Sequence, residues 1–338
     1  MTRQRFENLF SRYAKLRVAV VGDFCLDRYL EIDPRKKEIS IETGLRVHNV
    51  VNVRSQPGGA GTILNNLAAL GVGTIFPVGF CGMDGEGYEL RRALEARPCV
   101  SLEYFFATPL RRTFTYCKPL LVERAKTPIE LNRLDSKNWT ITPAPVQERI
   151  AKTIQSLSRK VDAIILLDQV DLAETGVVTR RVLQATSAVA KARPRLLLLA
   201  DSRRGLKHFP PAIFKMNRAE LARLLGVPKQ LGLEALKKQA ASLARRSKRP
   251  VFVSLSEQGI LGASPKGEVE WVPALPVRGE IDIVGAGDAV TANLTAALAA
   301  GASLRESLEI SNAAASIVIH QLGTTGVATP NDIARLLK

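Results

Sequence analysis

The chain has 338 residues, with 48 Lys and Arg against 32 Asp and Glu, so its formal net charge is +16. Hydrophobic residues make up 46% and charged residues 24%, ordinary globular values that exclude a disordered tail, a collagen-like repeat and a coiled-coil rod. No apolar run reaches the roughly 18 residues of a membrane-spanning helix. The segment 1–16 lacks the apolar core of a signal peptide, so we expect a cytoplasmic protein without a membrane partner.

Short apolar runs alternate with longer segments whose apolar residues recur at helical spacing. The runs predict strands and the longer segments predict helices. The predicted strands are 18–21, 74–78, 164–167, 196–200, 213–216 and 251–255, and the predicted helices are 63–70, 85–96, 174–191, 233–246 and one from residue 218. This order predicts a single α/β domain over 1–338, with a central mostly parallel sheet flanked by helices on both faces.

Two segments, at about 29–55 and 101–124, interrupt this alternation because each holds β-type pieces with no helix between them. The pieces are 39–42, 45–53, 102–106 and 113–117. We expect them to form a small second sheet that stands at one edge of the core as a β lid.

The cysteines, histidines and basic residues are all dispersed. No CxxC or HExxH spacing is present, so we expect reduced thiols and no zinc site. The basic residues form many short groups, and aromatic residues are only 5% of the chain, which is little for stacking on bases. The charge therefore indicates a solvated basic surface, or a surface that attracts phosphorylated small molecules. Nucleic acid is a less favoured partner, and binding to random DNA with a steep salt dependence would support it.

The strongest functional signal is D-I-V-G-A-G-D at 282–288, which follows an extended stretch (271–277) and opens a small apolar helix (289–300). Free amides at a helix start bind an anion. A carboxylate there would repel phosphate, so Asp288 suggests removal of a proton from a hydroxyl, as phosphoryl transfer to an alcohol requires. From the residues alone, two other interpretations of this segment stay open. Asp288 could simply cap the helix, or the glycines could belong to a dinucleotide-binding motif that lacks its third glycine. No GxxxxGK[ST] segment is present, which excludes a P-loop kinase.

This segment resembles the signature of the ribokinase-like (PfkB) carbohydrate kinases, usually D-[TV]-[TN]-G-A-G-D. Other segments match that family in order along nearly the whole chain: Pro57–Ala60, Val78–Gly87, Asn217–Glu220, Ser256–Gly259 and Asn312–Ala315. The segments Gly22–Tyr29, Arg133–Asp135 and Leu322–Thr325 are most similar to the D-glycero-β-D-manno-heptose 7-phosphate 1-kinases of ADP-heptose synthesis. A fused nucleotidyltransferase domain, found in some of those enzymes, is not part of this sequence.

The resemblance implies a ribokinase-like transferase that uses ATP and Mg²⁺, with room for a monovalent cation, and phosphorylates a sugar or sugar phosphate. It implies that Asp288 is the general base and that the amides of Gly285, Ala286 and Gly287 form the anion hole. On the sugar side it implies Asp27, Gly58, Gly59 and Arg203, and on the nucleotide side Asn217, Glu220, Ser256, Gly259 and Asn312, with Glu220 acting on Mg²⁺ through water. A homodimer through the lid is a further implication.

Plainer interpretations stand beside these roles: a turn residue for Asp27, a Pro-Gly turn for Gly58 and Gly59, a polar helix pair for Asn217 and Glu220, and a solvated side chain for Arg203. Departures from the family pattern are Thr62 in place of Asn, Val284 in place of Thr or Asn, and the segment Asp168–Asp171, which lacks an aromatic residue and a lysine. These departures affect the prediction of the sugar substrate more than the prediction of the reaction. A kinase for another sugar or a nucleoside, and a non-catalytic relative that binds a nucleotide or sugar, are therefore the alternatives.

Overall fold

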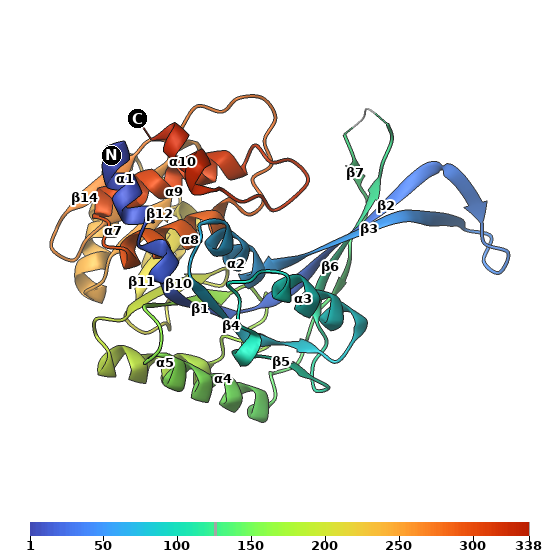
Figure 1. The fold of residues 1–338 in the computed structure, drawn as a ribbon, viewed down its shortest axis with the longest axis horizontal. Helices are drawn as coiled ribbons and strands as arrows, with labels where there is room; N and C mark the ends of the chain where they lie inside the picture. Colours follow the sequence, from blue (N-terminus) through green and yellow to red (C-terminus); the bar gives the residue numbers. More distant parts are fainter. Residues whose placement is uncertain (125–126, 338) are drawn as a thin grey trace.

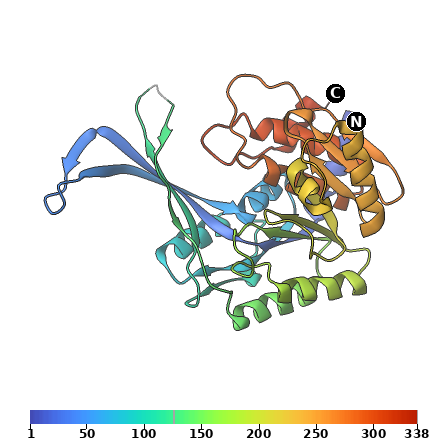
Figure 2. The ribbon, with the colours of Figure 1, turned by 180° about the vertical axis from the view of Figure 1, so that it is seen from behind.

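The computed structural model describes residues 1–124 and 127–337. A nine-stranded sheet runs through the body in the order β14-β13-β12-β11-β10-β9-β1-β4-β5 (Figures 1 and 2). The strands from β12 to β5 pair in parallel, and β13 and β14 add an antiparallel edge. The bounds are β1 Arg17–Gly22, β4 Thr74–Gly82, β5 Phe105–Thr108, β9 Ala163–Asp168, β10 Leu197–Ser202, β11 Ile213–Asn217, β12 Val251–Ser254, β13 Ile260–Ala263 and β14 Val269–Val272.

Helices cover both faces of this sheet, because its central strands are apolar on both sides. Along β1, for example, Val18 and Val20 join one hydrophobic cluster while Ala19 and Val21 join the other, as the two-residue period of a strand dictates. One face carries α1 Arg3–Phe10, α2 Ala60–Ala69, α3 Gly85–Glu95, α8 Ala286–Ala299, α9 Leu304–Val318 and α10 Pro330–Leu336, and the other carries α4 Ala144–Leu157, α5 Arg180–Ala192, α6 Arg218–Leu225 and α7 Leu233–Ser247. The predicted α/β architecture is confirmed.

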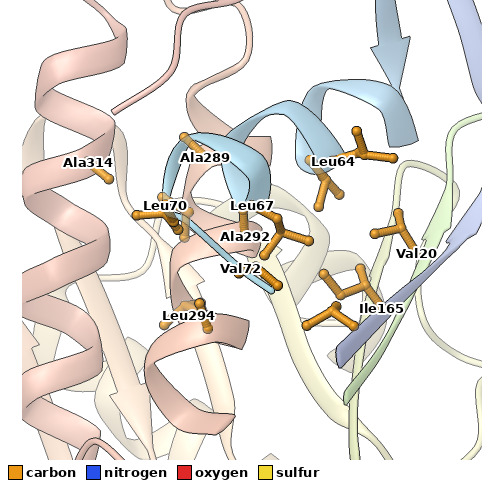
Figure 3. Close-up of a cluster of buried hydrophobic side chains, with 14 of the residues drawn as sticks. Val20, Leu64, Leu67, Leu70, Val72, Ile165, Ala289, Ala292, Leu294 and Ala314 are labelled. Atoms are coloured by element: carbon orange, nitrogen blue, oxygen red, sulfur yellow. The ribbon is translucent and has the colours of Figure 1, made fainter. Parts of the chain in front are cut away.

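Helices α2 and α8 pack side by side on the same face of the sheet, as Figure 3 shows. Leu64 and Leu67 pack with Val20 and Ile165 of the sheet in one cluster that also contains Ala289 of α8. All five side chains are fully buried. This packing fixes the start of α8, and with it the glycine-rich turn, against the rigid centre of the molecule.

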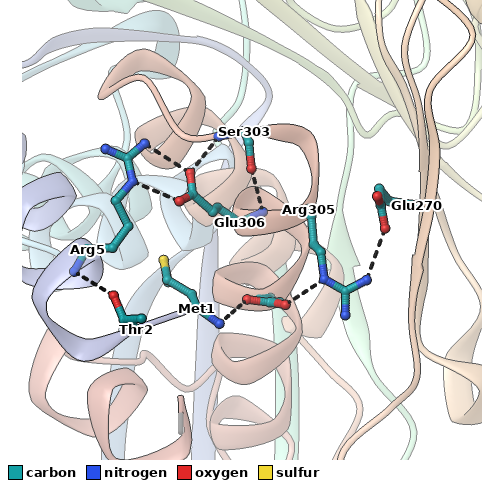
Figure 4. A network of polar contacts seen from close by, with 8 residues as sticks. Met1, Thr2, Arg5, Glu270, Ser303, Arg305 and Glu306 are labelled. Atoms are coloured by element: carbon teal, nitrogen blue, oxygen red, sulfur yellow. Dashed lines mark hydrogen bonds and ion pairs between the residues drawn. The ribbon is translucent and has the colours of Figure 1, made fainter.

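Polar contacts join α1 to the start of α9. Arg5 of α1 pairs with Glu306 at 2.8 Å, and Glu306 also accepts from the Ser303 amide at the start of α9 (Figure 4). The Arg5 hydrogen bond holds the pKa of Glu306 at about 2. Arg305 links the same helix to Glu270 of β14 at 3.0 Å.

A second sheet projects from the body as a long twisted hairpin with shorter strands beside it (Figure 1). Its order is β3-β2-β6-β7, with β8 also paired to β6, and the bounds are β2 Phe24–Ile39, β3 Arg46–Gly59, β6 Phe114–Leu121, β7 Ile129–Glu130 and β8 Leu134–Ser136. We call these five strands the lid. The hairpin is longer than the segment 29–55, because β2 begins directly after β1.

Several predicted elements differ from the structure. Of the piece 39–42 only Ile39 belongs to a strand, β2, and the rest lies in the connection to β3, while helix α2 begins at Ala60 rather than at 63. The piece 102–106 was assigned to the second sheet, but Phe105–Thr108 pairs in parallel with β4, because Phe105 and Phe106 are both buried in the core. Helix α5 begins at Arg180 rather than at 174, since Thr179 caps it through the Val182 amide. Helix α8 begins at Ala286 rather than at 289. None of the described helices is both long and apolar enough to span a membrane.

Candidate active site

Two neighbouring cavities meet at the glycine-rich turn before α8. The first, of about 430 Å³, opens where β1, β9 and β10 end, between the sheet and the lid. Ligands of open α/β sheets bind at such carboxyl ends. Its lining residues are Asp23, Cys25, Asp27, Gly59, Thr62, Phe114, Tyr116, Lys118, Arg133, Gln169, Val170, Arg203, Ile283, Val284, Gly285, Asp288 and Thr325.

Asp27 lies in this cavity beside cations that the lid supplies. Its side chain is 9% exposed, and Lys118 Nζ of β6 lies 3.7 Å from Asp27 Oδ1. Burial raises the pKa of Asp27, against the opposing effect of Lys118 and Arg133. Gly58 lies so close behind this carboxylate that a Cβ on it would clash with Asp27 Oδ2. Asp27 is therefore held in a fixed position facing the cavity, and Gly58 supports it without lining the cavity.

Three cations line the same cavity: Lys118, Arg133 and Arg203. The Arg133 guanidinium lies over the Tyr116 ring at 5.2 Å from its centroid and donates to Asp135 at 2.6 Å. Arg203 lies 3.6 Å from Asp171. The sequence predicts Arg203 as a site residue, but it does not predict Lys118 or Arg133. Arg133 nevertheless lies in Arg133–Asp135, one of the segments that are similar to the heptose kinases.

Asp288 is half-buried in the first turn of α8. Burial raises its pKa to about 7, with Lys215 lowering it and Asp201 raising it. Gly285 is the residue that caps α8, and no side-chain bond caps this helix in the described chain, so Asp288 is not a helix cap. A carboxylate with a pKa near neutrality in a cavity is suited to exchanging protons at physiological pH.

The turn 283–287 presents part of the predicted anion hole. The Gly285 φ of +84° is one that favours glycine. The amide of Ala286 donates to the Ile283 carbonyl at 3.2 Å, so it is already engaged, contrary to the prediction that all three amides are free. The amides of Gly285 and Gly287 make no backbone hydrogen bond to the described chain. Two free amides at the start of a helix still form an anion site.

Lys215 stands behind this turn and was not predicted. It is buried in the middle of β11, where its Nζ donates to Asp201 Oδ2 at 2.7 Å, and Thr291 Oγ1 of α8 donates to the same oxygen at 3.1 Å. A Cβ on Gly287 would lie only 3.1 Å from Lys215 Nζ, so the ammonium lies directly against the turn. The signal in the sequence was a lysine inside an otherwise apolar strand, F-K-M, which needs a partner when buried.

The second cavity, of about 490 Å³, lies on the far side of the turn. Its walls are mainly apolar, with Ile260, Leu275, Val277, Ile281 and Ile319 among them. Of the residues predicted for the nucleotide side, four line it: Asn217, Ser256, Gly259 and Asn312. A mainly apolar cavity next to an anion site suits a flat ring attached to phosphates.

Glu220 does not line either cavity. It forms a capping box with Asn217: its Oε2 accepts from the Asn217 amide at 2.7 Å, and Asn217 Oδ1 accepts from the Glu220 amide at 2.9 Å. Both residues thus stabilise the start of α6. Across residues 1–124 and 127–337, no three His, Cys, Asp or Glu side chains are grouped to hold a metal ion.

Asp23 is a second buried carboxylate that sequence reasoning did not single out. Its oxygens accept from the Val177 amide at 2.6 Å and the Gln169 amide at 2.8 Å, so it fastens both ends of the loop that follows β9. Burial and the nearby Asp168 raise its pKa to about 7. The loop supplies Gln169 and Val170 to the first cavity, so Asp23 positions one of its walls.

The three departures from the family pattern all lie at the first cavity or beside it. Thr62 and Val284 line it. Asp171, at the far end of the altered segment, pairs with Arg203 and with Lys137, the latter at 2.8 Å. The carboxylate of Asp171, which departs from the family pattern, therefore restrains Arg203, one of the cations of the cavity.

Comparison with known proteins identifies the family of this chain. The profile of the pfkB family carbohydrate kinases matches residues 15–331. A protein of Azorhizobium caulinodans named "Bifunctional protein HldE" is 29% identical over 311 residues, and one of the same name from Trichlorobacter lovleyi is 29% identical over 335 residues. These matches cover 92% and 98% of this chain but only 62% and 65% of the relatives, so the chain spans about two-thirds or less of their length.

Solved structures share the fold. Phosphofructokinase-2 from Escherichia coli, in complex with substrates and products, superposes with a TM-score of 0.72 at 19% identity, over 95% of this chain and 98% of that one. Ribokinase from Arabidopsis thaliana, complexed with ribose and ATP, gives a TM-score of 0.67 at 20% identity, over 96% and 99%. The chain belongs to the pfkB family of carbohydrate kinases, enzymes that transfer phosphate to a hydroxyl group.

Proposed function

We propose that this kinase transfers the γ-phosphate of ATP to a hydroxyl of a phosphorylated sugar, with a heptose 7-phosphate as the first candidate. The observation that carries the proposal is the set of three cations, Lys118, Arg133 and Arg203, in the cavity that also holds Asp27 and Asp288. A neutral sugar has no need of three cations, whereas a sugar phosphate offers a dianion to them. The resemblance to heptose kinases names the sugar. A homodimer through the lid stays part of the proposal.

In this proposal each side chain has a distinct task. Asp27 accepts hydrogen bonds from sugar hydroxyls and orients the ring, and the cations hold the phosphate that the sugar already carries. Asp288 accepts the proton of the attacking hydroxyl. The amides of Gly285 and Gly287, with Lys215 behind them, face the charge on the transferred group. The two cavities meet at this turn, so acceptor and donor approach it from opposite sides.

Mg²⁺ fits this site as an ion carried by the nucleotide rather than by a protein cage, because the described residues offer no cluster of three ligands. Glu220 lines neither cavity, and one of its carboxylate oxygens is held in the capping box of α6, so its expected action on Mg²⁺ would run through water. When bound, the ion would neutralise charge on the phosphates. The apolar second cavity would take the adenine ring.

An ADP-release screen over free sugars, sugar 6- and 7-phosphates and nucleosides tests the proposal. We expect a sugar phosphate to give the highest kcat/KM, and the Arg133→Ala variant to lose about tenfold or more of that preference, as removal of a charge-assisted contact predicts. Arg92→Ala, an arginine of α3 outside the cavity, is the matched control. A free sugar or nucleoside preferred over every phosphate would contradict the proposal.

Asp27→Ala is expected to raise KM for the sugar substrate by about tenfold or more with little change in the Kd for ATP, since the carboxylate would contact only the acceptor. The measurement is steady-state kinetics at saturating ATP, together with nucleotide titration. Unchanged sugar kinetics would mean that Asp27 is only a turn residue. Gly58→Ala is a useful companion, because its Cβ would press on the same carboxylate from behind.

A further inference from the structure

Folding gathers basic residues that are dispersed in the sequence along the edge of the large sheet opposite the two cavities. Four segments, 15–17, 159–162, 191–196 and 245–249, lead into the parallel strands β1, β9, β10 and β12 and therefore lie at their amino ends. Together they hold eleven Lys and Arg and one carboxylate, Asp162, so they carry +10 of the chain's +16. We call them the basic edge. Its cations are Lys15, Arg17, Arg159, Lys160, Lys191, Arg193, Arg195, Arg245, Arg246, Lys248 and Arg249.

The basic edge is one continuous surface, because contacts join each segment to the next. Arg249 Nη1 donates to Pro194 O at 3.0 Å, Arg193 Nη1 to Ser158 O at 3.1 Å, and the Asp162 amide to Arg17 O at 2.9 Å. Ten of the eleven cations are in exposed positions, and Arg249 is half-buried. The edge ends on both sides: the turn 264–268 holds one Lys and one Glu, and the loop 70–73 before β4 holds no charge.

The charge of the basic edge is not neutralised by the described protein. Among its cations, Lys160 alone has an ion-pair partner in residues 1–124 and 127–337, Glu103 at 4.0 Å. Asp162 accepts a hydrogen bond from the Arg17 amide, so its carboxylate is partly used. The large apolar residues of these segments, Leu16, Val161 and Leu196, are buried. Uncompensated like charges raise the free energy of the folded chain through self-repulsion, and a bound polyanion would relieve it.

We propose that the basic edge binds the phosphate backbone of a double-helical nucleic acid without reading its sequence. Five strands from β12 to β1 at about 4.8 Å spacing give an edge of about 19 Å. A duplex carries one charge per about 1.7 Å of its axis, so that length faces about 11 phosphates on two strands. Seven of the eleven cations are arginine, whose planar fork matches phosphate oxygens.

Two other polyanions fit less well. A single strand is held largely by bases stacked on aromatic rings, and no exposed large aromatic side chain lies in the basic edge. An anionic bilayer is usually bound by an amphipathic surface that inserts apolar side chains, and the edge exposes none of those either. The inference is independent of which sugar the kinase phosphorylates, because the edge is at the other end of the strands.

Fluorescence anisotropy with a labelled random-sequence DNA duplex of about two helical turns tests the proposal, using the full chain. We expect a slope of log K against log salt of about −4 to −5 between roughly 50 and 200 mM, from release of counterions at about five phosphates. An RNA duplex of equal length tells whether the helix form matters. A single strand and phosphatidylserine vesicles test the two disfavoured polyanions.

The decisive variant carries Lys191→Glu, Arg195→Glu, Arg245→Glu and Arg246→Glu. It should bind the duplex at least ~30-fold more weakly at about 100 mM salt, with a salt slope shallower by about 3 to 4. The control variant carries the same change in net charge elsewhere, as Lys36→Glu, Lys37→Glu, Lys229→Glu and Lys238→Glu, and should bind within about threefold of the wild type. If the Glu variant fails to fold, a variant with Gln at the same four edge positions replaces it in the binding measurement.

Three results would overturn the proposal: no measurable duplex binding by the wild type, equal weakening in the edge and control variants, or vesicles binding where the duplex does not. The ADP-release rate with the best acceptor should be the same in both variants, because none of the eight positions lines either cavity. A parallel loss of that rate would show that the edge variant is misfolded, and the Gln variant then decides.

Discussion

Asp288→Asn should lower kcat by at least ~10², because the attacking hydroxyl loses the group that would accept its proton. The amide keeps the size of the side chain and leaves the Gly285 and Gly287 amides in place, so the Kd for ATP should change by less than about threefold. Rapid-quench measurement of phosphoryl transfer, with nucleotide titration beside it, checks both expectations. A variant that turns over at the wild-type rate would remove Asp288 from the proposed role.

The pH dependence gives an independent readout of the same carboxylate. Its pKa is raised to about 7, and a base acts only when deprotonated, so kcat/KM should fall about tenfold per pH unit below 7 and level off above it. In the Asp288→Asn variant the small remaining rate should lose this dependence. Asp23 also has a pKa near 7, but it would titrate in both proteins, so the difference between the two profiles isolates Asp288.

Stability should move in the opposite direction to activity. A carboxylate whose pKa is higher in the folded than in the unfolded chain favours folding when it is protonated, and that contribution is lost as the pH rises from about 4 through 7. At pH 8 the ionised Asp288 therefore costs stability that Asn avoids. Asp288→Asn should have the higher Tm at pH 8, with a smaller difference at pH 5. A lower Tm at pH 8 would mean that the carboxylate stabilises the fold instead.

The glycine-rich turn alone pointed to Asp288, whereas Asp27 and Arg203 were expected at the site through the family resemblance. All three line the first cavity, at the carboxyl edge of the parallel strands. Lys118 and Arg133 were not predicted, because their positions depend on how the lid strands pair: β6 with β2, where Asp27 stands opposite Tyr116, and β8 with β6, where Leu134 stands opposite Cys117. A shift of β6 by one residue would turn its side chains to the other face of the lid.

The same limit explains two errors of detail. Phe105–Thr108 has the short apolar composition of a buried strand, and only its pairing with β4 shows which of the two sheets it joins. Ala286 belongs to the predicted anion hole by its place in the signature, but the turn that brings Gly285 to φ +84° also directs the Ala286 amide at the Ile283 carbonyl. The basic edge is a third case, since four segments spread over more than 230 residues meet only through the order of the strands.

Lys215→Met should impair the enzyme in two separable ways. Removing the ammonium leaves Asp201 buried with no cation, which should cost about 3–5 kcal/mol of folding free energy. It also removes the positive charge that lies against Gly287, so kcat should fall by about 10² to 10³, as for loss of one group that stabilises charge in the transition state. Burial lowers the pKa of Lys215, but Asp201 and Asp288 more than offset this, so the group is charged at neutral pH.

The double variant Lys215→Met and Asp201→Asn separates the two effects. With no unpaired charge left, the free energy of unfolding, measured in urea, should recover most of the loss, and Thr291 can still donate to the amide oxygen at position 201. The rate of phosphoryl transfer should stay low, because the cation at the turn is still missing. If the double variant regained both stability and kcat, Lys215 would serve only the fold, and the charge on the transferred group would have to be met by the two free amides and the nucleotide's metal ion alone.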